Sequence, residues 1–499
     1  MSAVLAPLSH AALPQALPAR TIAVAAGDGI GPEITAAVLG VLAAADPTLS
    51  FQQVTVGLKA YQSGASSGFG PEALDAVTGH GVILKGPVMT PSGGGYKSVN
   101  VSFRKLLGLY ANVRPSIAYH PFVTAMHPEM DVVVIRENEE DTYAGIEHRQ
   151  TDEVVQCLKL VTRPGCERIC RYAFEYARAH GRRKVTCMTK SNIMKLTDGL
   201  FQQVFEEIAR DYPEIKAEHM IIDIGTARMA ARPGDFDVVV TPNLYGDILS
   251  DVAAEVSGSI GLAGSANIGR DCAMFEAVHG SAPDIAGKNI ANPSGLLLAA
   301  VMMLRHLGRH EPATLIHNAW LRTLEDGVHT GDIFRAGISK RRVGTQGFAE
   351  AVIERLGLRP RHFPEVAEGN TMPALPATGA AAPSRPQRKE LVGVDVFLHW
   401  DEQARDPAVL GRRLETLRTA GLGFELITNR GVKVYPGGCP QTLRSDHWRC
   451  RFSGDGSTVD RREIPELLVL LAEAGFDVVK TENLYAFDGE PGYSRAQGG

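Results

Sequence analysis

The sequence predicts an α/β fold over most of the chain and a small α+β domain at its end. Between Thr21 and about Leu356, short apolar runs of strand length alternate with amphipathic stretches of helical spacing. This alternation is typical of α/β proteins. Residues 368–390 are rich in Pro and Ala and show no periodicity, so we expect a linker there. At 499 residues, the chain has room for about three domains.

Six strand-like runs occur in the first part of the chain. They are residues 21–24, 82–87, 131–137, 184–189, 219–224 and 237–242. Two amphipathic stretches, residues 168–181 and 199–212, have the apolar spacing of helices. Strands that alternate with helices predict βαβ units and a largely parallel sheet.

After the linker, the pattern changes to strand, helix, hairpin, strand, helix and strand. These elements are expected at residues 391–400, 407–421, 423–436, 446–454, 464–475 and 476–487. The mixture predicts a small α+β domain over residues 391–499. It shows no catalytic constellation, so packing between subunits is its expected role, with allosteric binding as the alternative.

The composition excludes several classes of protein. The formal net charge of −5 argues against a general nucleic-acid binder. No run of about 18 uncharged apolar residues occurs, so no membrane span is expected. Seven cysteines, an odd number in so long a chain, indicate a reducing compartment, and we expect the cytoplasm. Residues 1–20 contain a single Arg, which favours a tail over a targeting peptide.

A glycine-rich stretch, Ala25–Ile34, lies between a predicted strand and a predicted helix. Its spacing is G-x-G-x-G-P, whereas the Rossmann fingerprint requires G-x-G-x-x-G. Asp28 would repel a pyrophosphate. Pro32 suits the first turn of a helix, and Glu33 suits the positive end of the helix dipole. The stretch therefore predicts a tight strand-to-helix turn, with or without a ligand.

Three arginines with short polar side chains nearby form the first chemical pattern. Arg104 follows Ser98 and Asn100, after a loop of three consecutive glycines. Arg114 and Arg136 adjoin apolar strand runs. Guanidinium groups bind carboxylates bidentately, so the set suits a small polycarboxylate. For each arginine alone, a role on the surface or in an ion pair remains the alternative.

A pair of aspartates forms the second pattern. Asp247 and Asp251 are four residues apart, so on a helix they share one face and repel each other. A hard divalent cation such as Mg²⁺ or Mn²⁺ would offset that repulsion. Asp223 lies at the end of an apolar strand run and is a candidate third ligand. The alternative is a solvated helix face.

A long turn-rich loop and two isolated residues complete the candidates. Residues 276–295 contain small residues and His279, and such a loop allows close backbone approach to a ligand. Tyr143 and Lys190 each lie near a predicted strand end. A Tyr and a Lys can act as acid and base once their pKa values are tuned, although lone residues of these types are usually structural.

Together these stretches resemble the motifs of the β-decarboxylating dehydrogenases, the family of isocitrate, isopropylmalate, homoisocitrate and tartrate dehydrogenases. The matching stretches are GDGIGPE, KGP, ANVRP, VVIRENEEDTYAGIEH, KSNIMK, NLYGDILSD and VHGSAPDIAGKNIANP. The resemblance spans about residues 21–357. The whole chain is similar to the longer bacterial isocitrate dehydrogenases with a C-terminal extension.

The resemblance implies a non-Rossmann fold in which a large and a small α/β domain share one sheet. The large, cofactor-binding domain is expected at residues 21–108 and 258–367. The small domain, for substrate binding and dimerisation, is expected at residues 109–257. In this family the GDGIGPE loop is not the dinucleotide fingerprint, and the HGSAPDIAG loop holds most of the cofactor.

The resemblance also implies isocitrate as the substrate. Isocitrate enzymes of the family carry Ser-x-Asn ahead of the arginine to bind the third carboxylate, and Ser98 and Asn100 match. The implied substrate residues are Thr90, Ser98, Asn100, Arg104, Arg114, Arg136, Tyr143, Lys190 and Asn192. Tyr143 is expected to protonate C3, and Lys190 with an adjoining aspartate to take the hydroxyl proton. Homoisocitrate and isopropylmalate dehydrogenases, or a non-catalytic regulatory subunit, are the alternatives.

Metal and subunit roles follow from the same resemblance. Asp223, Asp247 and Asp251 are expected to hold Mg²⁺ or Mn²⁺. In the family, Lys190 and Asp223 reach into the site of the neighbouring subunit. At least a homodimer is therefore expected.

The cofactor prediction depends on one position in the loop. NADP enzymes of the family carry Lys-Tyr after HGSAP, whereas this chain carries Asp284 and Ile285. A carboxylate there would bind ribose hydroxyls and repel a 2′-phosphate, so NAD is expected. Arg335 nearby keeps NADP open as the alternative. The expected cofactor residues are Thr90, His279, Gly280, Ser281, Ala282, Pro283, Asp284, Ile285 and Asn292.

Overall fold

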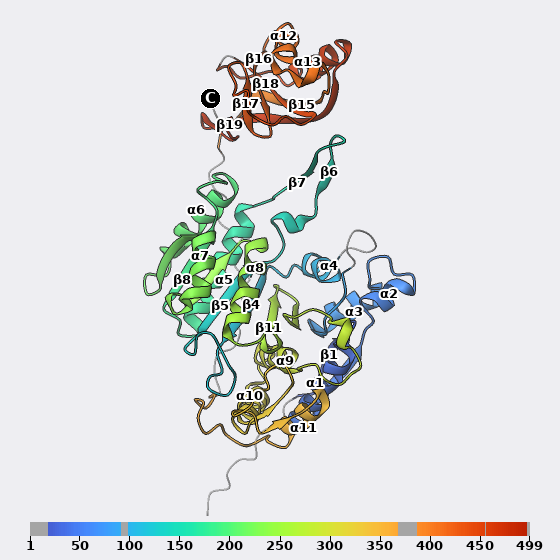
Figure 1. Ribbon diagram of the computed structural model, residues 1–499, viewed down its shortest axis with the longest axis vertical. Helices are drawn as coiled ribbons and strands as arrows, with labels where there is room; N and C mark the ends of the chain where they lie inside the picture. Colours follow the sequence, from blue (N-terminus) through green and yellow to red (C-terminus); the bar gives the residue numbers. More distant parts are fainter. Residues whose placement is uncertain (1–17, 91–97, 368–386, 455, 497–499) are drawn as a thin grey trace, which may run out of the picture. The chain divides into compact units, whose positions relative to one another are not determined.

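Ten strands form one mixed sheet in the first of two compact units (Figure 1). The computed structural model describes residues 18–90, 98–367, 387–454 and 456–496. The sheet order is β2-β1-β3-β12-β11-β4-β5-β10-β8-β9. Its strands are β1 (Arg20–Ala25), β2 (Leu49–Gln53), β3 (Val82–Lys85), β4 (Ala111–Ile117), β5 (Asp131–Glu137), β8 (Lys184–Thr189), β9 (Lys216–Ile221), β10 (Val238–Thr241), β11 (Gly264–Ile268) and β12 (Ala273–Ala277).

The pairing of these strands confirms the predicted α/β class. β11 runs antiparallel to both β12 and β4, and β4 runs antiparallel to β5, while the other neighbours are parallel. β3, β10 and β12 are buried at every residue, as expected for strands covered on both faces. The order differs from that of a Rossmann sheet, which agrees with the poor match of the glycine stretch to the dinucleotide fingerprint.

Helices accompany these strands. They are α1 (Gly31–Ala45), α2 (Leu58–Gln62), α3 (Pro71–His80), α4 (Val99–Leu106), α5 (Arg163–Ala179), α6 (Thr197–Ala209), α7 (Ile222–Ala231), α8 (Asn243–Ser257), α9 (Ser294–His306), α10 (His310–Glu325) and α11 (Thr345–Ile353). Pro32 lies in the first turn of α1, as predicted. None of the described helices is long and apolar enough to cross a bilayer.

One predicted strand is shorter than expected. The run 219–224 was expected to be a strand throughout, but β9 ends at Ile221 and α7 begins at Ile222. Asp223 therefore lies in the first turn of a helix and not at a strand end. A short apolar run does not distinguish a strand from the start of a helix, and a carboxylate is favourable at a helix N-terminus.

The second unit comprises residues 140–167 and 190–204 and the C-terminal domain after the linker. A six-stranded sheet in the order β17-β16-β18-β15-β19-β20 forms its centre. The strands are β15 (Lys389–His399), β16 (Gly423–Asn429), β17 (Val432–Tyr435), β18 (His447–Ser453), β19 (Asp477–Phe487) and β20 (Glu490–Pro491). The helices are α12 (Pro407–Glu415) and α13 (Glu463–Glu473).

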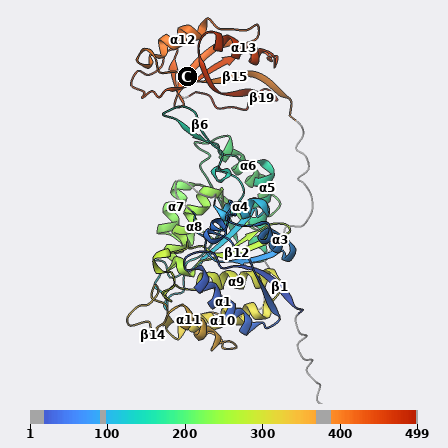
Figure 2. The same cartoon turned by 90° about the vertical axis from the view of Figure 1, so that its right-hand side faces the viewer.

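This domain confirms the predicted α+β pattern. The chain order β15-α12-β16-β18-α13-β19 and the spatial order of these strands are those of a ferredoxin-like β-α-β-β-α-β unit. α12 and α13 pack on one face of the sheet through a core of Leu410, Leu414, Leu467 and Leu471 against Val396 and Trp448 (Figure 2). β15 begins at Lys389, two residues before the predicted boundary, and residues 368–386 of the predicted linker lie outside the described residues.

Candidate active site

A buried triad of charges lies where β3 and β12 run side by side. Lys85 and Glu276 are register partners on these parallel strands, and Lys85 Nζ lies 2.8 Å from Glu276 Oε2. Arg104 of α4 reaches the other oxygen of Glu276, at 3.2 Å. Asn267 also donates to Oε1 at 3.0 Å. Burial opposes ionisation of Glu276, but the charges of Lys85 and Arg104 outweigh it and lower its pKa to about 2.

The triad fixes the direction of Arg104 without using all of its donors. Nε of Arg104 and Oδ1 of Asn100 are buried, and neither has a hydrogen-bond partner among the described residues. Asn100 and Arg104 are four residues apart on α4, so they share one face of the helix. Ser98 precedes the helix and does not use its side chain as a cap. Buried polar atoms without partners are the expected sign of a ligand-binding surface.

The other two predicted arginines lie on neighbouring strands of the sheet. Arg114 of β4 pairs in register with Val134 of β5, two residues before Arg136. Because side chains alternate along a strand, Arg114 and Arg136 point to the same face. Both are buried. Asn112 orients Arg114 by accepting from its Nε at 2.6 Å, and Asn243 accepts from Nε of Arg136 at 3.0 Å.

The two aspartates of α8 face these arginines. Arg114 Nη2 lies 3.2 Å from Asp247 Oδ1, and Arg136 also pairs with this oxygen. Arg114 Nη1 lies 3.4 Å from Asp251. The arginines thus offset the repulsion that the four-residue spacing predicts. Burial raises the pKa of Asp251, with Arg114 opposing and Asp247 adding to the rise.

The third predicted metal ligand stands apart from the pair. Asp223 is exposed at the start of α7. Within the described part of one chain, no three His, Cys, Asp or Glu side chains converge on a metal-binding point. Asp247 and Asp251 remain partly exposed, at 35% and 56% of their side chains, and both present oxygen donors. Hard oxygen donors fit Mg²⁺ or Mn²⁺, and the pair supplies two of them.

Tyr143 and Lys190 belong to the second unit. Tyr143 lies in a single helical turn, Thr142–Ala144, which Asp141 caps by accepting from the backbone N–H of Thr142 at 2.8 Å. Lys190 follows β8 directly, and its backbone N–H donates to buried Asp198 at 2.6 Å. Lys159 also pairs with Asp198, at 2.7 Å. Asn192 is exposed two residues later, so its side chain is accessible.

The glycine stretch supports the loop around Ser281 that the sequence assigns to the cofactor. Asp28 accepts from the backbone N–H groups of Leu58 and Met89, at 3.0 Å and 2.8 Å, so its carboxylate ties three loops together. Thr90, the next residue, is exposed. Ile30 donates its N–H to the carbonyl of Ser281 at 2.9 Å. Gly29 has φ +59°, and a Cβ there would lie 1.9 Å from that carbonyl, so only glycine permits the contact.

Residues 279–292 form the loop that the sequence assigns to the cofactor. His279 is partly buried, its Nδ1 lies 3.0 Å from the carbonyl of Gly280, and its Nε2 is buried without a hydrogen-bond partner among the described residues. Burial lowers the pKa of His279, so the ring is neutral. Pro283–Ile285 form one helical turn that leaves Asp284 exposed. A buried ring nitrogen that lacks a hydrogen-bond partner among the described residues is suited to binding a polar ligand in this loop.

A basic segment flanks this loop. Asn292 donates to Asp332 at 2.9 Å, and Asn289 accepts from the N–H groups of Thr345 and Gln346. These contacts hold both ends of residues 333–345 against the loop. The segment contains no acidic residue and four basic ones, Arg335, Lys340, Arg341 and Arg342. All four are exposed, and none forms an ion pair with another described residue.

Comparison with known proteins decides the family. A family model described as isocitrate/isopropylmalate dehydrogenase matches residues 21–352. The chain belongs to the isocitrate/isopropylmalate dehydrogenase family. A second model, described as the C-terminal domain of bacterial isocitrate dehydrogenase, matches residues 389–499. The resemblance predicted from the motifs is thus confirmed for both parts of the chain.

Relatives in this family differ in the cofactor that they name. A protein of Rickettsia felis named isocitrate dehydrogenase [NADP] is 50% identical over 96% of this chain and 99% of its own. A Thermus thermophilus protein of the same name is 47% identical over 96% of each chain. A Drosophila melanogaster protein named as a probable isocitrate dehydrogenase [NAD] subunit is 46% identical, over 62% of this chain and 81% of its own. The full-length relatives therefore carry NADP in their names, and the NAD prediction finds no support in them.

Solved structures of the family share this fold. A protein from Thermus thermophilus aligns over 96% of both chains, with 45% identity and a TM-score of 0.90. Isocitrate dehydrogenase from Methylococcus capsulatus aligns over 68% of this chain and 99% of its own, with 44% identity and a TM-score of 0.65. The predicted fold class is confirmed.

The structure adds two residues that the sequence did not single out. Lys85 and Glu276 lie 191 positions apart, and only the parallel pairing of β3 with β12 brings them together. Their one sequence signal is a charged residue in an otherwise apolar run, at its end for Lys85 and within it for Glu276. Such a charge has to be paired when the run is buried.

Proposed function

We propose that the protein catalyses the metal-dependent oxidative decarboxylation of isocitrate to 2-oxoglutarate and CO₂, with reduction of NADP. The observation that carries this proposal is the set of three buried arginines, with Arg104 Nε and Asn100 Oδ1 on one helix face and without hydrogen-bond partners among the described residues. The names of the full-length relatives agree with it.

The chemistry of the arginine cluster suits a tricarboxylate. Each guanidinium can hold one carboxylate bidentately. Arg114 and Arg136 share one strand face, and Arg104 is close enough for its charge to act on Arg114. Ser98 and Asn100 add neutral hydrogen-bonding groups beside Arg104, where a carboxylate is bound more readily than an isopropyl group.

Asp247 and Asp251, completed by Asp223, are the proposed holders of Mg²⁺ or Mn²⁺. When bound, the metal supplies a Lewis acid for the oxygen on C2 of the substrate. The nicotinamide ring of the cofactor, held by residues 279–292, supplies the hydride acceptor. Because no three metal-type ligands converge within the described part of one chain, we assign Asp223 to the partner's site in at least a homodimer.

The chain's own residues handle the protons. Lys190 of the partner subunit, with an adjoining aspartate, takes the proton of the C2 hydroxyl as hydride leaves C2. Tyr143 then gives a proton to C3 after CO₂ has left from that carbon. Arg104, Arg114 and Arg136 hold the carboxylates in place through both stages, so that the reacting carbon keeps its orientation.

A substrate comparison tests the proposal. The kcat/KM for isocitrate is expected to exceed that for 3-isopropylmalate by about four orders of magnitude, because a site that hydrogen-bonds a polar group rejects an analogue that lacks it. Homoisocitrate is expected to fall between the two. Comparable efficiency with 3-isopropylmalate would contradict the assignment of Ser98 and Asn100.

The choice of NADP rests on the basic segment around Arg335. Four exposed cations without ion-pair partners among the described residues border the cofactor loop, and a basic group there accommodates a 2′-phosphate. Asp284 is the observation that favours the second candidate, NAD, since an exposed carboxylate suits ribose hydroxyls. Asp284, Asp332 and Glu33 place three carboxylates at this loop against four cations, so the local charge remains positive and we give NADP precedence.

Neutralising the segment tests this choice. The triple variant Arg335→Gln, Arg341→Gln, Arg342→Gln is expected to lower kcat/KM for NADP by about a hundredfold and to leave that for NAD within a few-fold, because only NADP carries the extra phosphate. Exposed Arg359→Gln is the matched control. Equal losses for both cofactors would show that the segment does not read the 2′-phosphate. A higher kcat/KM of the wild-type protein with NAD than with NADP would instead support the NAD prediction made from Asp284.

A further inference from the structure

The C-terminal sheet has one face that its own helices do not cover. A hairpin of the second unit, β6 (Glu147–Arg149) and β7 (Val155–Cys157), lies against that face. Thr151 donates to Asp446 at 2.6 Å, and Glu153 pairs with Arg405 at 2.8 Å. Lys480 donates to Gln156 at 3.3 Å. Figure 2 shows β6 on the side of this sheet opposite to α12 and α13.

A pocket of about 260 Å³ lies between the hairpin and the sheet. We call it the hairpin pocket. Its lining residues are Val154, Gln156, Phe397, Thr428, Arg430, Gly431, Ser445, His447 and Arg449. None of these residues is acidic, and two are arginines. The pocket is therefore suited to a negatively charged ligand.

Three buried polar atoms of residues that line this pocket have no hydrogen-bond partner among the described residues, although one of them, Arg449 Nε, lies 3.7 Å from Asp395 Oδ2. They are Oγ1 of Thr428, Nε2 of His447 and Nε of Arg449. Thr428 is 1% exposed and His447 is 9% exposed, so bulk water does not replace the missing partners. A buried donor without an acceptor costs free energy, and three at one pocket require an explanation. Each of these atoms can donate a hydrogen to the same acceptor group.

The positive charge of Arg449 is only weakly compensated. Its nearest carboxylate, Asp395, lies 3.7 Å away. Arg451 already holds Asp395 with two hydrogen bonds, at 2.8 Å and 3.0 Å. Register places Thr428 and Arg449 side by side on β16 and β18. Arg430 adds a second cation at the pocket wall.

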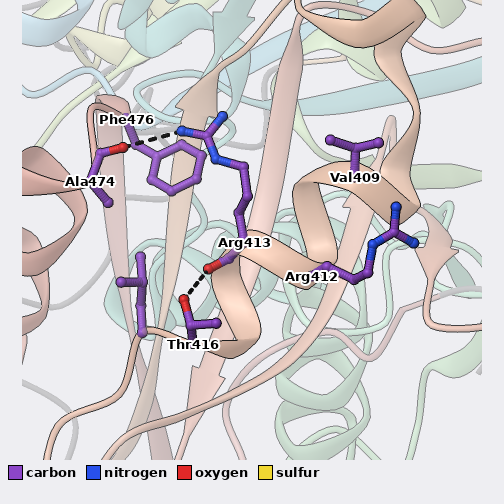
Figure 3. Close-up of a pocket in the computed structure, with 7 residues that line it drawn as sticks. Val409, Arg412, Arg413, Thr416, Ala474 and Phe476 are labelled. Atoms are coloured by element: carbon purple, nitrogen blue, oxygen red, sulfur yellow. Dashed lines mark hydrogen bonds between the residues drawn. The ribbon is translucent and has the colours of Figure 1, made fainter.

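A second pocket in the same domain differs from the hairpin pocket, because the protein itself already binds the arginine in it. It lies beside α12, measures about 430 Å³ and contains Arg413 (Figure 3). Arg413 donates to the carbonyl of Ala474 at 3.2 Å and lies 4.4 Å from the ring centre of Phe476. Its guanidinium is thus already satisfied by the protein. Of these two pockets, only the hairpin pocket is lined by buried donors that lack hydrogen-bond partners among the described residues.

We propose that the hairpin pocket binds a small organic oxyanion, a carboxylate or a phosphate monoester, through Thr428, His447 and Arg449. The hydroxyl of Thr428, Nε2–H of His447 and Nε–H of Arg449 donate to the oxyanion, and Arg430 adds charge at the entrance. Phe397 and Val154 form an apolar wall for the rest of the ligand. This site is separate from the proposed active site and does not depend on the proposed reaction.

Titration of the full-length protein with inorganic phosphate and, separately, with malonate tests this proposal by calorimetry. One of the two anions is expected to bind saturably, which also distinguishes a phosphate from a carboxylate ligand. Arg449→Gln is expected to weaken that binding about a hundredfold. Thr428→Val is expected to weaken it about tenfold, without loss of stability, because the variant removes a hydroxyl that has no partner in the unliganded fold.

Arg412→Gln is the matched control, since Arg412 is an exposed arginine of the same domain that does not line the hairpin pocket. It is expected to bind like the wild type. Thr428→Val keeps the test decisive if Arg449→Gln does not fold. The proposal is overturned if neither anion binds saturably, or if Thr428→Val and Arg412→Gln bind with wild-type affinity.

Discussion

Replacement of Arg136 by Gln is expected to reduce kcat/KM for isocitrate by about a thousandfold. Arg136 is 1% exposed, and its guanidinium is oriented by Asn243 and Asp247. Loss of one partner from a buried, hydrogen-bonded charge pair costs about 2–5 kcal/mol, and each 1.4 kcal/mol is tenfold. Steady-state kinetics with isocitrate and Mn²⁺ measures the change.

Two further variants separate charge from geometry at this position. Arg136→Lys keeps the positive charge but loses the planar fork, so an intermediate loss is expected. Arg178→Gln removes an exposed arginine from α5 and is expected to retain wild-type kinetics, since its side chain is 53% exposed and contacts Glu175 and the ring of Tyr212 and none of the predicted site residues. If Arg136→Gln kept more than a tenth of wild-type kcat/KM, Arg136 would not be a carboxylate anchor.

Replacement of Lys85 by Met is expected to lower the free energy of unfolding by about 3–5 kcal/mol, because it leaves Glu276 buried without its closest cation. The urea midpoint at pH 7 measures this loss. Lys184→Met is the control, since Lys184 and its partner Glu218 are partly exposed, at 21% and 30%. Lys184 also donates to the backbone carbonyl of Asp235, so a loss smaller than that of Lys85→Met is expected. An equal loss in both variants would contradict the account of the triad.

The same triad predicts an acid sensitivity with a defined sign. Glu276 titrates at a pKa of about 2 in the fold, below its ordinary 4.5. A lowered pKa gives stability that is fully present above pH 4.5 and lost as pH falls from 4.5 toward 2. Without Lys85 the pKa of Glu276 rises, so Lys85→Met is expected to lose stability at a higher pH than the wild type does.

The sequence predicted most of the elements because their patterns are local. Six of the ten strands of the large sheet, and the β-α-β-β-α-β order of the C-terminal domain, follow from apolar periodicity and turn residues. The end of β9 did not follow, since Ile221 and Ile222 look alike in sequence but one ends a strand and the other begins a helix. The sheet order came from the structure alone, because periodicity does not encode which strands pair and the resemblance implied only that two α/β domains share one sheet.

The candidate site also contains some residues that the sequence predicted and others that it did not. Arg104, Arg114, Arg136 and the Asp247–Asp251 pair were recognisable from residue type and spacing. The Lys85–Glu276 pair was not, because strand pairing and not chain proximity joins them. The atoms without hydrogen-bond partners in the hairpin pocket come from three strand residues. The sequence could not predict this pocket, because it forms only where the hairpin lies over these strands.

The initial rate of nicotinamide reduction with isocitrate and Mn²⁺, measured with NADP and with NAD, tests the central claim most directly. The account predicts one 2-oxoglutarate per nicotinamide reduced, a higher kcat/KM with NADP, and loss of the rate when the metal is chelated. Absence of 2-oxoglutarate with both cofactors would contradict the assignment of the arginine cluster to isocitrate.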